Sequence, residues 1–193
     1  MGWWVSGILL AALVVVVAIV ELSDRTEPTV AGVPPVGGLG PAPNVDLSSM
    51  TARQAADNLF NRVMQAVANG NTTEATNFLP MAIAAYDLAR PLDADGLFHL
   101  SLLQRAAREQ EAALQSALDG LAANPDHLLN LYGAAEASVA LGDSAAARGY
   151  YERLLAAWDR EIAADRLEYE EHGALLPLIR EDAEAFLSDG GPN

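Results

Sequence analysis

The chain has 193 residues, of which 26 are acidic and 11 basic, and its formal net charge is −15. It contains no cysteine, which excludes disulfides and metal sites built on thiolates. Every basic residue is arginine, and the acidic excess argues against a surface that binds nucleic acid or anionic lipid, because both need a cationic footprint. A basic patch on a protein partner would instead be attracted to it.

The first element is an apolar run, Trp3–Leu22, which predicts a transmembrane helix. About 20 helical residues, each rising about 1.5 Å, cross the roughly 30 Å hydrocarbon core of a bilayer. Trp3 and Trp4 would lie at one membrane interface, where amphipathic rings gather. A cleaved signal peptide is the alternative, but the run has no charged start, is too long and ends without a small-x-small cleavage site. We therefore expect an uncleaved anchor.

The predicted span also has small residues that would permit close packing against another helix in the membrane. Gly7 and Ala11 form a small-xxx-small pair, so we expect Trp3, Trp4, Gly7 and Ala11 to contribute to packing of the span. Orientation is poorly specified, since Arg25 is the only basic residue within reach of the span.

Residues 23–48 are predicted to form a linker rather than a packed element. The segment contains five prolines and a Gly-Gly-Leu-Gly run. Proline removes backbone donors and favours extended backbone, whereas glycine adds flexibility. We interpret the segment as a semi-extended tether between the membrane and the following domain.

Residues 49–193 show helical periodicity and no convincing alternating run, which predicts an all-α domain. Thr51 and Gln54 form a predicted capping box at the first helix, and the aspartates at 93 and 95 are expected to cap the third. Gly173 and Pro177 should dent the last helix. The expected helices begin near 51, 73, 95, 111, 126, 144 and 167.

The domain repeats itself at an offset of 34 residues, the tetratricopeptide period. Aligned positions include Ala113 with Ala147 and Leu121 with Leu155. The chain resembles the tetratricopeptide-repeat family over nearly all of residues 51–187, with about three helix pairs and a C-terminal helix. Earlier units match less well, and Arg108 stands where the family often has glycine.

This resemblance implies a concave groove that takes a peptide or helix from a partner. The family's groove positions correspond here to Asp95, Phe98, Leu102, Arg105, Leu129, Tyr132, Glu136 and Val139. Phe98 and Tyr132 would either anchor a bound helix or complete the core between repeats, and both interpretations stay open.

The sequence presents no motif for catalysis or for a metal. Its three histidines, His99, His127 and His172, fall in three different helical regions without a metal-binding spacing. Glu168 and His172 are expected to form a surface pair at i, i+4, and His127 to belong to a helix start. We therefore expect no enzyme activity, no metal, no cofactor and no small-molecule substrate.

These observations predict a non-catalytic, membrane-anchored scaffold or accessory subunit. Its repeat domain and span would bind and stabilise a larger membrane complex, such as a respiratory or photosynthetic one. The alternative is an assembly factor or chaperone-like adaptor that binds client proteins transiently in the envelope. Partners would be protein subunits and the lipid bilayer, without nucleic acid. From the resemblance we expect a single-pass protein of a bacterial inner membrane, with its C-terminal domain in the periplasm.

Overall fold

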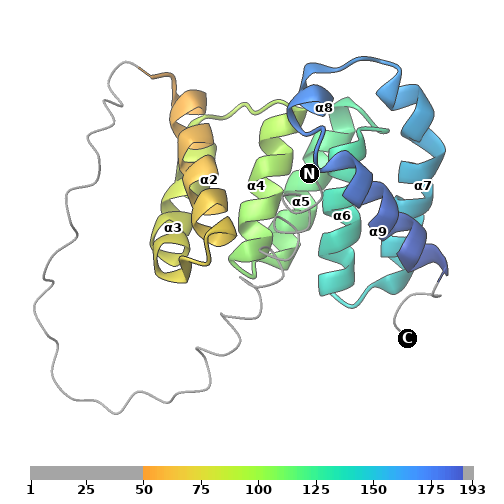
Figure 1. Ribbon diagram of the computed structural model, residues 1–193, viewed down its shortest axis with the longest axis horizontal. Helices are drawn as coiled ribbons and strands as arrows, with labels where there is room; N and C mark the ends of the chain where they lie inside the picture. The colour runs from red at the N-terminus through yellow and green to blue at the C-terminus, as the bar shows by residue number, and fades with distance from the viewer. Residues whose placement is uncertain (1–49, 189–193) are drawn as a thin grey trace, which may run out of the picture.

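A computed structural model describes residues 50–188 of the chain (Figure 1). This part contains helices and no strand, so the all-α prediction is confirmed for it. The helices are α2 (Ala52–Ala68), α3 (Thr72–Leu88), α4 (Ala94–Ala106), α5 (Gln110–Ala123), α6 (Leu128–Ala140), α7 (Ser144–Ile162), α8 (Leu167–Glu171) and α9 (Leu176–Ser188).

Local side-chain capping explains where several helices begin. Thr51 forms the predicted capping box with Gln54 at the start of α2. Asp93 caps α4 by accepting the Gly96 backbone N–H at 2.8 Å. His127 is the N-cap residue of α6, as expected. These caps satisfy backbone donors that a helix leaves free in its first turn.

Within residues 50–188, the helices α2 to α7 form three pairs that lie side by side: α2 with α3, α4 with α5, and α6 with α7 (Figure 1). The turn inside each pair contains a residue with positive φ: Gly70 at 70°, Arg108 at 64° and Gly142 at 78°. Glycine adopts this left-handed region without steric cost. Arg108 adopts it as well, at the position where the sequence lacks the glycine of the other two turns.

The core lies between the pairs, and α4 and α6 are its centre. Phe98, Leu100, Leu128, Leu129 and Leu131 are fully buried. Small residues allow the helices to approach closely, because Ala113, Ala117 and Ala147 are also fully buried. The repeated alanines of the sequence therefore serve packing.

The predicted last helix is broken into two. α8 ends at Glu171 and α9 begins at Leu176, and Gly173 lies between them. Pro177 lies in the first turn of α9, where the backbone N–H that proline lacks would make no hydrogen bond within the helix. The break lets the chain fold back over the repeats, so that α9 lies across α6 and α7 (Figure 1). Tyr132 donates a hydrogen bond to Asp182 across this contact.

Among residues 50–188, no helix combines the length and apolar character that crossing a membrane requires. The predicted span at 3–22, including Trp3, Trp4, Gly7 and Ala11, lies outside the described residues, and so does the predicted linker at 23–48.

Candidate functional site

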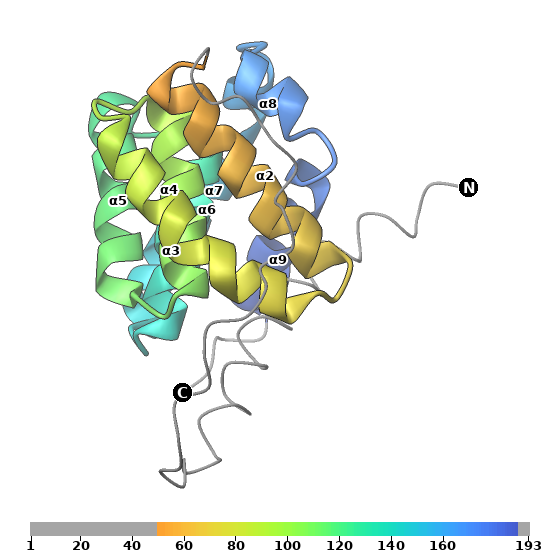
Figure 2. The ribbon, with the colours of Figure 1, turned by 90° about the vertical axis from the view of Figure 1, so that its left-hand side faces the viewer.

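A cavity of about 760 Å³ lies between the N-terminal helices and the C-terminal segment of the domain. Its walls come from α2, α4 and the stretch that joins α8 to α9. Figure 2, viewed from the side of α2 and α3, shows α8 at the same end of the domain as the start of α2. The apolar lining residues are Phe60, Met64, Phe98, Leu102, Ala174, Leu175 and Leu178, and the polar ones are Arg53, Asp57, Asn61, Asp95, His99, Glu171 and His172.

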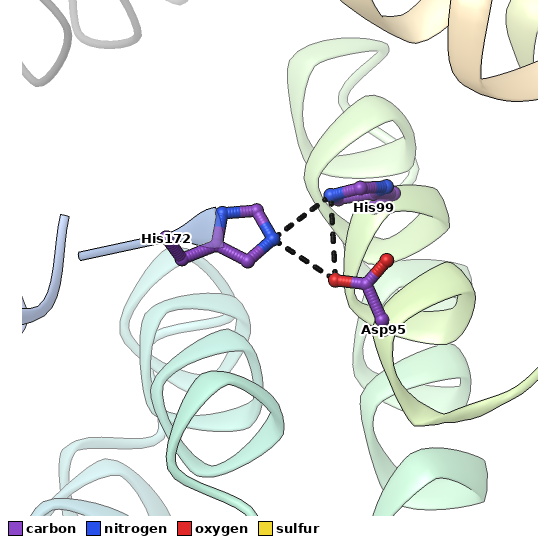
Figure 3. Close-up of side chains that lie close together, drawn as sticks. All are labelled: Asp95, His99 and His172. Atoms are coloured by element: carbon purple, nitrogen blue, oxygen red, sulfur yellow. Dashed lines mark hydrogen bonds and ion pairs between the residues drawn. The ribbon is translucent and has the colours of Figure 1, made fainter. Parts of the chain in front are cut away.

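Three of the polar residues form a triangle at the cavity wall (Figure 3). Asp95 and His99 lie one turn apart on α4, so their side chains share a helix face. His172 is the C-cap residue of α8 and points at them from the other side. His172 Nε2 lies 2.9 Å from Asp95 Oδ1 and 3.2 Å from His99 Nε2, and His99 Nε2 lies 3.6 Å from Asp95 Oδ1.

A hydrogen-bond chain fixes the ring of His99 from behind. The Tyr86 hydroxyl donates to Asp57 Oδ1 at 2.6 Å and lies 3.0 Å from His99 Nδ1. The hydroxyl has one proton, which it donates to Asp57, so it can only accept a hydrogen bond from His99. This assigns a proton to His99 Nδ1. In the neutral form of His99, Nε2 then presents a lone pair to the triangle.

Aromatic packing holds both imidazole rings. Phe60 stacks on His99 with ring centroids 4.0 Å apart and an interplanar angle of 16°. Phe98 contacts His172 edge-on at 5.6 Å. The rings are thus positioned by packing as well as by hydrogen bonds.

Arg53 joins the carboxylates that surround the triangle. Its guanidinium contacts Asp57 at 2.9 Å and Asp95 Oδ2 at 2.7 Å, and it also bonds Asp93. The pKa of Arg53 is raised, because hydrogen bonds to Asp93 and Asp57 outweigh the opposing effect of its burial. A single cation is thus shared among three carboxylates.

Asp57 and Asp95, the two carboxylates beside His99, are ionised at neutral pH. Burial would raise the pKa of Asp57, but hydrogen bonds with His99, Tyr86 and Arg53 lower it to about 2. Burial opposes ionisation of Asp95 as well, yet its hydrogen bond with His172 and nearby positive charge lower its pKa. The cavity wall is therefore negatively charged.

This arrangement supports proton sharing or cation binding. Asp95, His99 and His172 offer three ligand atoms that all lie within 4.8 Å of one another. A small cation, or a proton held between two acceptors, fits the space among the three atoms.

No protein-family model, curated protein or solved structure matches this chain.

The predicted groove residues divide between two places. Asp95, Phe98 and Leu102 line the cavity. Arg105, from the same unit, instead forms an ion pair at 2.5 Å with Glu136 of the next unit, where Tyr132 hydrogen-bonds to Asp182. Leu129 is fully buried in the core, and Val139 is partly buried against it. Of the predicted groove residues, Asp95, Phe98 and Leu102 thus contribute to this cavity, and the other five do not.

The structure contradicts the predicted surface pair of Glu168 and His172. Glu168 and His172 do not pair with each other: Glu168 Oε1 lies 3.4 Å from His127 Nε2, and His172 contacts Asp95. One part of the triangle could be read from the sequence, because Asp95 and His99 are spaced i, i+4 and therefore share a helix face. The approach of His172 depends on the fold-back after α8, which no local pattern announces.

Proposed function

We propose that this protein is a non-catalytic binding protein, a membrane-anchored scaffold or accessory subunit that holds a segment of a partner protein in the cavity. The observation that carries the proposal is the cavity itself, whose apolar walls come from both ends of the domain. Its rim includes the exposed residues Asn61, Glu171 and Ala174, so a segment can enter from the surface. Apolar hollows of this kind suit anchor side chains of a partner.

The charges around the cavity favour one kind of occupant. The chain carries a net charge of −15, and Glu171 and Asp57 line the cavity beside its apolar wall. A partner segment with apolar side chains next to an arginine or lysine would bury the former against Met64 and Leu178 and place the latter by the carboxylates. Electrostatic complementarity would speed association and select among partners.

The predicted anchor and tether place this binding domain beside a membrane, where a larger membrane complex would supply the partner. An accessory subunit would persist in the mature complex at constant stoichiometry. The alternative, an assembly factor or chaperone-like adaptor, would be substoichiometric and leave on completion.

The test compares two methionines in the full-length protein, purified in mild detergent with its bound partners. Met64 lines the cavity, whereas Met81 is 54 % exposed and is not a cavity residue. Met64→Glu adds a charge to the apolar wall and should abolish co-purification of the partner, while Met81→Glu should leave it intact. Reciprocal tagging of the co-purified protein then identifies the partner and its stoichiometry.

Both variants must first show unchanged thermal unfolding, so that a loss reports on binding. Retention of the same partner by Met64→Glu would place the contact elsewhere and refute this proposal. The buried pair Phe98 and Tyr132, 0 % and 2 % exposed, is less suitable for the test because its substitution would damage the core.

A further inference from the structure

We propose that Asp95, His99 and His172 bind one Zn²⁺ ion, through Asp95 Oδ1 and the Nε2 atoms of the two histidines. The proposal goes beyond the proposed partner binding and does not depend on it, since all three ligands belong to this chain.

The spacing of the three atoms is the first argument. A tetrahedral Zn²⁺ with ligand bonds of about 2.0–2.1 Å has ligand-to-ligand edges of about 3.3 Å. The three edges here measure 2.9, 3.2 and 3.6 Å. An ion above the triangle would reach all three atoms after shifts of a few tenths of an ångström.

The chemistry of the donors is the second argument. Two imidazole nitrogens and one carboxylate oxygen match the preference of Zn²⁺ for nitrogen and oxygen ligands, whereas Ca²⁺ and Mg²⁺ prefer sites made of oxygen alone. The neutral tautomer of His99 that donates from Nδ1 to Tyr86 directs the lone pair of Nε2 into the triangle. His172 would bind through the same Nε2 that faces Asp95 and His99.

Outer contacts orient two of the three ligands, as metal sites require. His99 Nδ1 donates to Tyr86, which in turn donates to Asp57, a relay that fixes both the ring and its tautomer. Arg53 occupies Asp95 Oδ2 and leaves Oδ1 toward the histidines. The charge of Arg53 is offset by Asp57, Asp93 and Asp95, so the site keeps a net negative charge for a divalent cation.

Three protein ligands leave one position of a tetrahedron, and the cavity supplies space for a water molecule there. The ion would join α4 to the segment after α8 across 77 residues of sequence. Its binding free energy would thus stabilise the fold-back of the C-terminal segment, because a ligand that binds only the native arrangement favours it.

A metal-free alternative uses the same atoms. The Nε2 proton of His172 can be shared between Asp95 Oδ1 and His99 Nε2, which satisfies all three groups without an ion. The two descriptions differ in the tautomer of His172 and in whether the triangle binds a cation, so a metal titration separates them.

The experiment uses the full-length protein in mild detergent, stripped with a chelator and then titrated with Zn²⁺ in competition with a chromophoric chelator. Co²⁺ serves as a second probe, since its visible spectrum reports coordination geometry. We expect one Zn²⁺ per chain and a higher Tm in its presence. His172→Gln and Asp95→Asn should each lower the affinity at least about 100-fold and abolish the Tm increase.

Two further variants sharpen the result. Tyr86→Phe keeps the ring but removes the partner of His99 Nδ1, and should weaken Zn²⁺ about 10-fold. His127→Asn removes the histidine outside the triangle while keeping a good helix cap, and should bind as the unmodified protein does.

Circular dichroism and the metal-free Tm establish that each variant is folded before its affinity is compared. Failure of the folded, unmodified protein to bind Zn²⁺ would overturn the proposal and leave the shared proton as the account of the triangle. Equal affinity in His172→Gln and the unmodified protein would overturn it as well, since the ion would then lie elsewhere. Partner capture, measured separately in chelator, reports on the proposed function alone.

Discussion

Gly120 of α5 and Asn130 of α6 lie so close that a Cβ on Gly120 would overlap the side-chain amide of Asn130. Asn130 cannot move away, because it is fully buried and its Nδ2 donates to the Ala94 carbonyl oxygen at 2.9 Å. This amide therefore links α6 to the beginning of α4, the helix that carries Asp95 and His99.

Gly120→Ala should lower the free energy of unfolding by about 1–3 kcal/mol, the usual cost of overpacking, although alanine favours helices more than glycine. Gly149→Ala is the matched control, since Gly149 lies in α7 with no atom within 4 Å of the added Cβ. The control should gain about 0.5–1 kcal/mol. Urea unfolding measures the change in unfolding free energy of both variants. Equal changes for Gly120→Ala and Gly149→Ala would contradict the close contact between Gly120 and Asn130.

Glu136→Gln should destabilise the domain by about 2 kcal/mol. Glu136 accepts hydrogen bonds from Arg105 and Tyr151, both at 2.5 Å, and the Arg105 side chain is only 10 % exposed. Removing the negative charge would leave a nearly buried cation without its partner, although the 25 % exposure of Glu136 moderates the cost.

The exposed pair of Arg180 and Glu184 provides the comparison for that ion pair. Its side chains are about half exposed and 2.9 Å apart, so Glu184→Gln should cost less than about 0.5 kcal/mol. Chemical denaturation of both variants gives the loss of unfolding free energy for each. The larger loss for Glu136→Gln should decrease little in high salt, because salt screens a nearly buried ion pair less than an exposed one. A cost for Glu136→Gln as small as that of Glu184→Gln would be the contrary result.

Acidification should destabilise the domain partly through His127. Its side chain is fully buried, and burial lowers its pKa below the usual 6.5, although Glu168 and Asp95 oppose this effect and Arg166 adds to it. Below pH 6.5 the unfolded chain takes up a proton that the native state resists, so unfolding becomes more favourable as pH falls. The stabilisation is complete above pH 6.5 and is lost toward the lower native pKa.

The measurement is the free energy of unfolding between pH 7 and 5, in chelator, for the unmodified protein and His127→Asn. The difference in unfolding free energy between the two proteins should change by at most about 1.4 kcal/mol per pH unit. The unmodified protein should lose more stability as the pH falls. Parallel curves would show that His127 takes up its proton equally in both states.

Gly142→Ala tests the turn between α6 and α7. Gly142 has φ of 78° and no atom within 4 Å of an added Cβ, so any cost comes from the backbone alone. We expect a loss of about 1–2 kcal/mol, and a smaller loss for Gly142→Asn, because asparagine tolerates the left-handed region. Thermal unfolding gives the relative stability of the two variants. A Gly142→Ala variant as stable as Gly142→Asn would contradict this prediction.

Local features of the fold could be predicted from the sequence, and long-range ones could not. The capping box at Thr51 and the cap at Asp93 depend on residues three positions apart, which the sequence displays directly. The break near Gly173 was expected as a dent, yet its effect on the direction of the chain depends on the packing of α9 against α7 and on the hydrogen bond from Tyr132 of α6 to Asp182. No periodicity specifies that packing.

The same distinction applies to the candidate site. Asp95 and His99 could be placed on one face of a helix from their spacing, but His172 could not be placed beside them. Arg53, Asp57 and Tyr86 come from α2 and α3, and each looks like an ordinary surface or core residue when its helix is considered alone. Their joint role becomes visible only when three helices and the fold-back are assembled.

The fold-back of the C-terminal segment sets an order of events during synthesis. Asp95 and His99 leave the ribosome 77 and 73 residues before His172, by which time the earlier helix pairs can already be folding. A chain that terminates before Leu167 would contain all three helix pairs but neither a complete triangle nor the far wall of the cavity. Formation of the site therefore comes late in the synthesis of this domain, after the three helix pairs and the segment through Leu178 have been made.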